Sequence, residues 1–238
     1  MKFALVENVR STAEPKKRGI CANCGEEMMA KCGRTKVWHW AHKSREMCDS
    51  WWENETKWHR AWKSEFPEDW QEIVHVDQQT GERHLADVKT AHGLVVEFQH
   101  SPIRNEERSS REKFYGNMIW IVDGLRGELD ASYFQMGLHR DPLQHNPLAY
   151  QLDWYGRSRI LHDWNASEKQ VFLDFGNAFT SGPSVVWRKI FFDPEKRRGV
   201  VAPYNKRSLI QAITEGEDIG VSYLPDKAET AEQTEERR

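Results

Sequence analysis

Hydrophobic and polar positions repeat with helical spacing in the stretch SWWENETKWHRAWKSEF, residues 50–66. Tryptophans and polar residues recur there every three or four positions, which is typical of an amphipathic helix. Ser50 is a suitable N-cap, and Pro67 cannot continue the helix. The pattern therefore predicts a helix from Ser50 to just before Pro67, with Glu55 and His59 one turn apart on one face.

Shorter apolar runs follow, and they predict strands at residues 71–77, 84–90 and 94–99, separated by the turns QTGE and AHG. These runs fit an antiparallel meander. Helix formers with an acidic start then predict a helix at residues 105–116, and MIWIVDG at 118–124 predicts a buried strand. The expected order is helix, three strands, helix, strand, which indicates an α/β (α+β) fold.

The pattern is weaker beyond residue 125, where short runs such as QVFLDFG, SVVWRKIFFD and SRILHDW predict strands and NKRSLIQAITEG predicts a last helix. We expect four parts, with a β-rich C-terminal region at 126–224 and a disordered, charged tail at 225–238. The first part is a cysteine-containing module at 1–49. The second is the helix-and-strand domain at 50–125.

The predicted hairpin brings two acids to one place. If Ala91 to Gly93 form a three-residue loop, Asp87 lies opposite Glu97, and Gln99 shares the face of Glu97. Facing carboxylates repel unless a cation lies between them, and oxygen ligands suit magnesium or manganese. Such an ion activates water for attack on a phosphodiester. The alternative is that both acids lie on a solvent-exposed face and pair with Lys89 or Arg83.

Four cysteines lie in the first fifth of the chain, at Cys21, Cys24, Cys32 and Cys48. CANC has the spacing of a zinc knuckle, and HWAHKSREMC adds two histidines and another thiol. The expected structural zinc site uses Cys21, Cys24 and Cys48 with His42, or with His39 in place of His42, and leaves Cys32 as a spare thiol. The alternative is an accidental CxxC with buried, apolar thiols.

Composition adds two points. The 238 residues carry a net charge of −3, yet residues 1–45 hold ten Lys/Arg against four Asp/Glu, so this region is a candidate polyanion-binding surface. No apolar run is long enough to span a bilayer or to form a signal peptide. We therefore expect a cytoplasmic protein without a membrane partner.

Several motifs together resemble the CoiA-like competence proteins. They are CANCG, HWAHKS with Cys48 following, ENETKWH, ADVKT, VVEFQHSPI and the R-x3-Y of REKFY, and they occur in order from about residue 1 to 125. The family motif HFAH reads HWAH here, and both of its histidines are present. The resemblance implies a zinc-binding module joined to a nuclease-like domain with the PD-(D/E)xK core.

The resemblance also implies roles for particular residues. Asp87 corresponds to the motif's Asp, Glu97 to the acid of (D/E)xK, and Gln99 to its Lys. Glu55 matches the acid of the first helix, and His59 matches a supporting position, as does Ser101. Gln99 can donate a hydrogen bond but has no charge, and Lys89 on the neighbouring strand is a candidate to replace that charge.

These features predict a magnesium-dependent deoxyribonuclease, or a DNA-processing protein, that acts in DNA uptake, recombination or defence. Asp87 and Glu97 would bind the ion, Gln99 would position water or phosphate, and Glu55 and His59 would complete the cleft. The main alternative is a non-catalytic DNA-binding factor on a degenerate nuclease scaffold. A third possibility is a zinc-stapled interaction domain without a nucleic-acid role.

Overall fold

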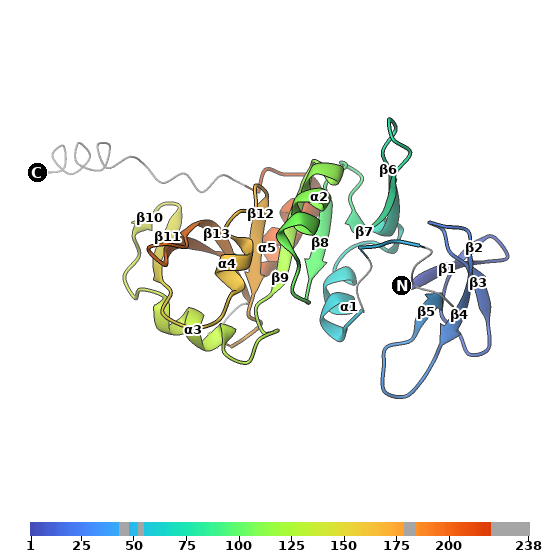
Figure 1. Ribbon diagram of the computed structural model, residues 1–238, viewed down its shortest axis with the longest axis horizontal. Coiled ribbons are helices and arrows are strands. Elements are labelled where there is room, and N and C mark those ends of the chain that lie inside the picture. The colour runs from blue at the N-terminus through green and yellow to red at the C-terminus, as the bar shows by residue number, and fades with distance from the viewer. Residues whose placement is uncertain (43–47, 52–54, 179–183, 220–238) are drawn as a thin grey trace, which may run out of the picture.

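The computed structural model describes residues 1–42, 48–51, 55–178 and 184–219, and it has two β-sheets with helices packed on the larger one (Figure 1). The predicted tail at 225–238 lies outside the described residues. No helix in the described ranges is long and apolar enough to cross a membrane. The fold is therefore mixed α and β, as the sequence predicts.

The N-terminal residues form a five-stranded antiparallel sheet that the hydrophobic pattern did not reveal. Its order is β2-β1-β3-β4-β5. The strands are β1 (Phe3–Val6), β2 (Val9–Thr12), β3 (Arg18–Ile20), β4 (Glu27–Lys31) and β5 (His39–His42). Its small core is centred on Met28 and Trp40, both almost fully buried. Because this core has so few buried side chains, a bound metal ion would contribute to the stability of the small sheet.

The second sheet has nine strands in the order β10-β11-β14-β13-β12-β9-β8-β7-β6. The strands are β6 (Gln71–Val76), β7 (Arg83–Lys89), β8 (Val95–Gln99), β9 (Met118–Asp123), β10 (Gln144–His145), β11 (Leu148–Asp153), β12 (Gln170–Asp174), β13 (Val185–Asp193) and β14 (Arg198–Asn205). Strand β9 pairs in parallel with both β8 and β12, and the other pairs are antiparallel. The predicted boundary at residue 125 therefore falls between strands of one sheet.

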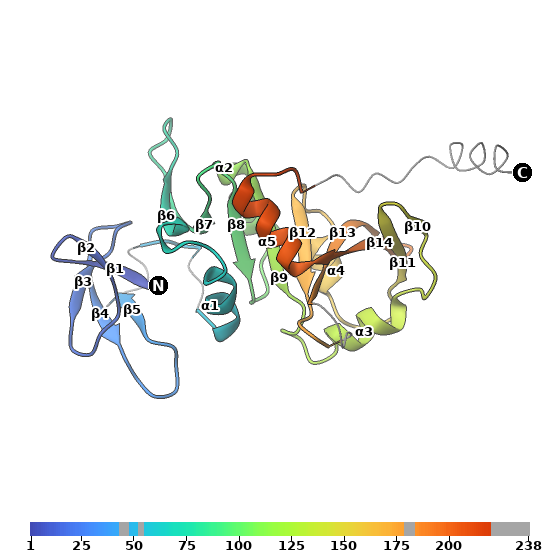
Figure 2. The same cartoon turned by 180° about the vertical axis from the view of Figure 1, so that it is seen from behind.

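Helices cover both faces of this sheet. They are α1 (Lys57–Lys63), α2 (Asn105–Tyr115), α3 (Asp130–Gly137), α4 (Ile160–Trp164) and α5 (Lys206–Glu215), with a short 3₁₀ turn η1 (Glu68–Trp70) before β6. Buried side chains of α1 and α5 pack on one face, and those of α2, α3 and α4 pack on the other. Figures 1 and 2 show α2 and α5 on these opposite faces. The predicted order of helix, three strands, helix, strand is present as α1-β6-β7-β8-α2-β9.

Two sequence predictions about helices were wrong. Helix α1 begins at Lys57 rather than after Ser50, because the Thr56 hydroxyl accepts from the His59 amide and the His59 ring accepts from the Thr56 amide, which completes a capping box. The segment SRILHDW contains helix α4 instead of a strand. Its buried residues are Ile160, Leu161 and Trp164, and this one- and four-residue spacing lies on one face of a helix but on both faces of a strand.

The two sheets are joined through buried carboxylates. Glu72 of β6 accepts from the backbone amides of Lys2 and Phe3, at 2.7–3.0 Å. Asp49 accepts from the backbone amide of Leu85 at 2.8 Å and contacts the His84 ring at 2.8 Å. These bonds hold β1 and the segment after Cys48 against β6 and β7, so a cleft forms where the two sheets meet.

Candidate metal centre and carboxylate cleft

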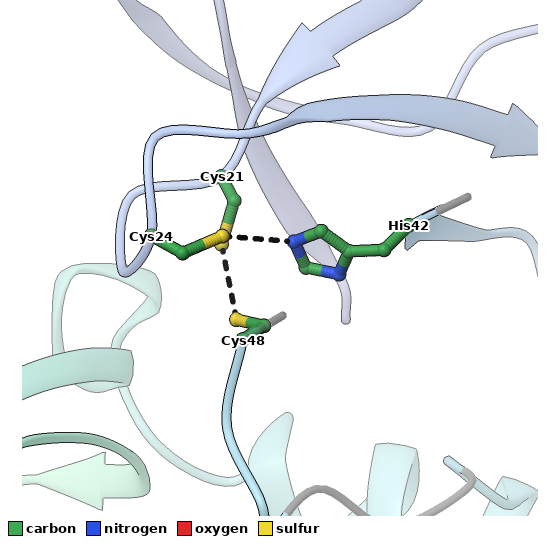
Figure 3. Close-up of side chains that lie close together, drawn as sticks. All are labelled: Cys21, Cys24, His42 and Cys48. Atoms are coloured by element: carbon green, nitrogen blue, oxygen red, sulfur yellow. Dashed lines mark hydrogen bonds between the residues drawn. The ribbon is translucent and has the colours of Figure 1, made fainter. Parts of the chain in front are cut away.

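The CANC turn positions two thiols beside β5. The Gly25 amide donates to the Cys21 carbonyl at 2.9 Å, and Gly25 has a φ of 77°, a conformation that glycine adopts without strain. The chain thus reverses directly after Cys24. Cys48 approaches from the segment leading to the larger sheet, and His42 is the last residue of β5 (Figure 3).

Four side chains meet at this point, and they are Cys21, Cys24, His42 and Cys48, whose ligand atoms all lie within 4.8 Å of one another. The sulfurs of Cys21 and Cys48 are 3.7 Å apart. Two thiolates about 2.3 Å from one tetrahedral zinc ion would be roughly 3.8 Å apart. Cys24 Sγ lies 3.3 Å from Nε2 of His42. The donor set and its spacing therefore fit a structural zinc ion.

The protonation of the cluster also favours a cation. The hydrogen bond from Cys48 lowers the pKa of Cys21 to about 5, and the same contact raises the pKa of Cys48. Two neighbouring sulfurs thus share a proton, which a metal ion would replace. The Asn23 amide lies 3.8 Å from the Cys48 sulfur, where it can orient that ligand. His39 and Cys32 are not part of this group among the described residues.

The register of β7 and β8 agrees with the predicted three-residue loop. The Thr90 amide donates to the Leu94 carbonyl at 2.9 Å, and Gly93 has a φ of 83°. The ladder pairs Val88 with Val96, so Asp87 and Glu97 would be the next pair along it.

At that position the two acids replace backbone hydrogen bonds with side-chain bonds. The Asp87 amide donates to Oε1 of Glu97, and the Phe98 amide donates to Oδ2 of Asp87, each at 3.1 Å. The strands separate locally, and both carboxylates are fixed beside each other by the backbone. Glu97 is 4% exposed, so the alternative of a solvent-exposed pair does not hold for it.

The two acids line a small cavity, which we call the carboxylate cleft, with a volume of about 50 Å³. It holds five carboxylates against three cations, an excess of two negative charges when all are ionised. The carboxylates are those of Asp49, Glu55, Glu72, Asp87 and Glu97, and the cations are Lys63, Arg111 and the N-terminal ammonium of Met1. Burial, and then the charge of Asp87, raise the pKa of Glu97 to about 8 despite Arg111. The cleft therefore favours additional positive charge.

Sequence reasoning did not predict Lys63, Asp49 or Glu72, and Lys63 makes the most contacts with the acids of the cleft. Its ammonium nitrogen lies 3.0 Å from Glu72, 3.1 Å from Glu55 and 3.2 Å from Asp87. Burial alone would lower the pKa of Lys63, but the three acids outweigh it and raise that pKa well above its usual value. Lys63 follows His59 by four residues and therefore lies on the same side of α1. This spacing was the sequence signal that could have predicted Lys63 as a cleft residue.

Arg111 supplies the second cation. It donates to Oε2 of Glu97 at 3.1 Å, to Glu107 at 2.5 Å and to the Trp51 carbonyl at 2.6 Å. Arg111 and Tyr115 are the two defined residues of the R-x3-Y motif, and both line the cleft. The motif was visible in the sequence, but its contact with Glu97 was not.

Other predicted residues occupy different positions from those expected. Glu55 lies before α1, not within it, and binds Arg60 at 2.5 Å as well as Lys63. His59 lines the cleft, where its Nε2 donates to the Phe98 carbonyl at 2.9 Å and its Nδ1 accepts from Thr56. Both residues hold the walls of the cleft in place.

Gln99 and Lys89 do not reach the cleft between Asp87 and Glu97. Gln99 donates to the Ser101 carbonyl at 2.9 Å and lines an adjoining cavity of about 540 Å³ instead. The ammonium of Lys89 lies 3.2 Å from the His75 ring. The predicted substitute for the missing motif lysine is therefore wrong, because Lys63 of α1 is the lysine that contacts Asp87.

Comparison with known proteins gave one match. Residues 7–50 match the family described as competence protein CoiA, N-terminal domain. This match confirms the resemblance to the CoiA-like competence proteins, and the matched range contains all the ligands of the candidate metal centre. No curated protein and no solved structure matches the chain.

Proposed function

From an N-terminal region that matches the CoiA family and contains a candidate zinc site, we propose that this chain processes DNA in competence. The reaction that we propose is magnesium-dependent cleavage of phosphodiester bonds, in DNA uptake, recombination or defence. The order α1-β6-β7-β8-α2-β9 supports a PD-(D/E)xK core for the region that carries the cleft.

The observation that carries this proposal is the backbone-fixed pair of Asp87 and Glu97 in a cleft with excess negative charge. Ordinary packing does not favour such a pair, because each acid raises the cost of ionising the other. A divalent cation removes that cost, and carboxylate oxygens are suitable ligands for magnesium.

The carboxylates of the cleft are suitable ligands for the ion, and each residue of the cleft has a separate role in the proposal. Asp87 and Glu97 would hold magnesium, which when bound polarises a phosphoryl oxygen and acidifies water. Lys63 holds Asp87 in place and keeps positive charge beside it, which lessens the need for a lysine at position 99. His59 fixes the Phe98 segment next to Glu97. Gln99 lines the adjoining cavity and would contact DNA that enters there.

The test is cleavage of plasmid and single-stranded DNA with magnesium or manganese, stopped by EDTA. Asp87→Ala and Glu97→Ala should each abolish cleavage, because each removes a ligand, while zinc content and circular dichroism stay unchanged. Glu106→Ala removes an exposed acid at the start of α2 and should cleave like the wild type. Full cleavage by both cleft variants would refute the proposal.

A second candidate function is DNA binding without catalysis. Two observations favour it: Gln99 carries no charge and lines the adjoining cavity, and Lys63 and Arg111 already give both acids cationic partners. In this case the purified protein binds DNA in a salt-dependent way but leaves plasmid intact with either metal.

A further inference from the structure

The loop between β4 and β5, residues 32–38, ends in an exposed tryptophan. Trp38 is 48% exposed, and it is the only tryptophan in the described ranges whose side chain is exposed rather than wholly or partly buried. Five others are fully buried, at Trp40, Trp62, Trp120, Trp154 and Trp164. Leaving an indole in water forfeits a large hydrophobic gain, so a surface tryptophan is suited to a contact made on binding.

Trp38 is held in position by hydrogen bonds at two points. Its Nε1 donates to the Gly33 carbonyl at 3.1 Å, which closes the loop on itself. Its own carbonyl accepts from Arg60 of α1 at 3.2 Å. Arg60 also binds Glu55, whose carboxylate lines the carboxylate cleft. The ring is therefore fixed relative to the cleft before any ligand arrives, which lowers the entropic cost of binding.

The charge around this ring is positive. Residues 31–38 contain Lys31, Arg34 and Lys36, all exposed, and no acid. Lys57, at the start of α1, is also exposed and shares a cavity of about 300 Å³ with Lys36. A fixed aromatic ring beside several cations is the arrangement that binds a polyanion with accessible rings.

A groove leads from this loop to the carboxylate cleft. Lys36 and His39 line the cavity of about 540 Å³ that also contains Gln99 and Ser101. That cavity adjoins the cleft, because both are lined by Met1, Asp49, Trp51, Leu85 and Arg111. In Figure 1 the β4–β5 loop extends beside α1, at the side where the two sheets meet.

We propose that the β4–β5 loop and this groove bind single-stranded nucleic acid, with a base stacked on Trp38 and phosphates at Arg34 and Lys36. An unpaired strand is the ligand that fits, because the faces of its bases are open to stacking, whereas those in a duplex are covered. The inference names the substrate class for the proposed function and rests on it for the role of the cleft.

The experiment measures binding of fluorescein-labelled oligo(dT) of about 20 nucleotides, and of a matched duplex, by fluorescence anisotropy with no magnesium or manganese added. Trp38→Ala should weaken oligo(dT) binding about 5- to 150-fold and change duplex binding little. Trp38→Phe should lose less affinity for oligo(dT) than Trp38→Ala, because phenylalanine keeps an aromatic ring for stacking. Tyr155→Ala removes a 75% exposed ring from the C-terminal half and should bind like the wild type.

A second variant tests the phosphate contact. Lys36→Gln should weaken binding and reduce the slope of log affinity against log salt by about 0.7. Unchanged affinity of Trp38→Ala for oligo(dT), or an equal loss on strand and duplex, would overturn the inference. Zinc content and circular dichroism of each variant exclude unfolding as the cause.

The outcomes separate this inference from the proposed function. Cleavage that needs Asp87, together with unchanged binding by Trp38→Ala, removes the inference and leaves the nuclease. Strand binding that needs Trp38, without any metal-dependent cleavage, keeps the inference and removes the nuclease in favour of the binding protein.

Discussion

Lys63 illustrates how a single buried charge organises the cleft. Its ammonium contacts three carboxylates from three different segments: Glu55 before α1, Glu72 on β6 and Asp87 on β7. Each buried acid alone would be costly, and Lys63 offsets part of that cost for all three. The residue thus contributes both to stability and to the position of Asp87.

Replacing Lys63 should therefore destabilise the fold. Lys63→Met keeps a chain of similar length but leaves three buried acids without this partner, which costs about 3–5 kcal/mol of unfolding free energy. Lys57→Met, on the exposed side of the same helix, should change it by less than about 0.5 kcal/mol. Urea unfolding measures both, and equal midpoints for Lys63→Met and the wild type would contradict the role assigned to Lys63.

Glu97 predicts a pH dependence of stability. In the unfolded chain its carboxyl titrates near the ordinary value of 4.5, whereas in the folded protein its pKa is about 8. Between these values the unfolded state loses this proton first, so the Glu97 contribution disfavours folding increasingly as pH rises and levels off above about 8. Lowering the pH from about 8 to about 4.5 removes this destabilisation.

The isosteric variant Glu97→Gln tests this dependence. It cannot ionise, so its stability relative to the wild type should improve steadily between about pH 5 and pH 8. Urea titrations across this range measure the difference, and Glu106→Gln is the matched surface control. A difference that does not change with pH would show that Glu97 has an ordinary pKa.

At the level of elements, the metal centre and the hairpin are linked through one short segment. Cys48 is a candidate metal ligand, and the next residue, Asp49, accepts hydrogen bonds from the backbone amides of Trp51 and Leu85. Leu85 lies on β7, two residues before Asp87. A bound metal would therefore fix the start of the strand that carries one of the catalytic candidates.

Loss of one metal ligand should loosen this strand. Cys48→Ser should lose zinc and increase hydrogen exchange at the Leu85 amide, since Asp49 is no longer held in place. Cys32→Ser changes a thiol outside the group and should keep both zinc and protection. Metal analysis and hydrogen-exchange mass spectrometry measure these effects. Zinc retained by Cys48→Ser would remove Cys48 from the ligand set.

The sequence predicted those elements whose signals are local. The strands around Asp87 and Glu97, and the turn at Gly93, follow from alternation and from one glycine. The start of α1 was missed because Thr56 competes with Ser50 as an N-cap, and only the capping box with His59 distinguishes them. The five-stranded sheet was missed because its strands are three to five residues long, too short for a periodic pattern.

The candidate site was predictable only in part, for the same reason. Asp87 and Glu97 are related by the register of one hairpin, which the sequence encodes. Lys63 and Arg111 contact these acids from two separate helices. The tertiary fold, which the local sequence pattern does not encode, determines which basic residues lie next to Asp87 and Glu97. Gln99 was placed with Glu97 by strand alternation, but its bond to Ser101 turns it into the adjoining cavity.

At the scale of the whole molecule, one sheet runs from the cleft through the C-terminal half. Strand β9 pairs with β8 on one side and with β12 on the other, and its residues Trp120 and Ile121 are fully buried. The small sheet is attached to β6, at the opposite edge from β10. The cleft is thus built on a strand pair that the C-terminal half extends.

This continuity limits how the chain can be divided. A fragment that ends at residue 125 would lack β12, so β9 would become an open edge strand with unpaired backbone groups and an uncovered apolar face. Such edges pair with other chains and aggregate. The region after residue 125 therefore protects the cleft, because its strand β12 pairs with β9 and prevents β9 from pairing with another chain.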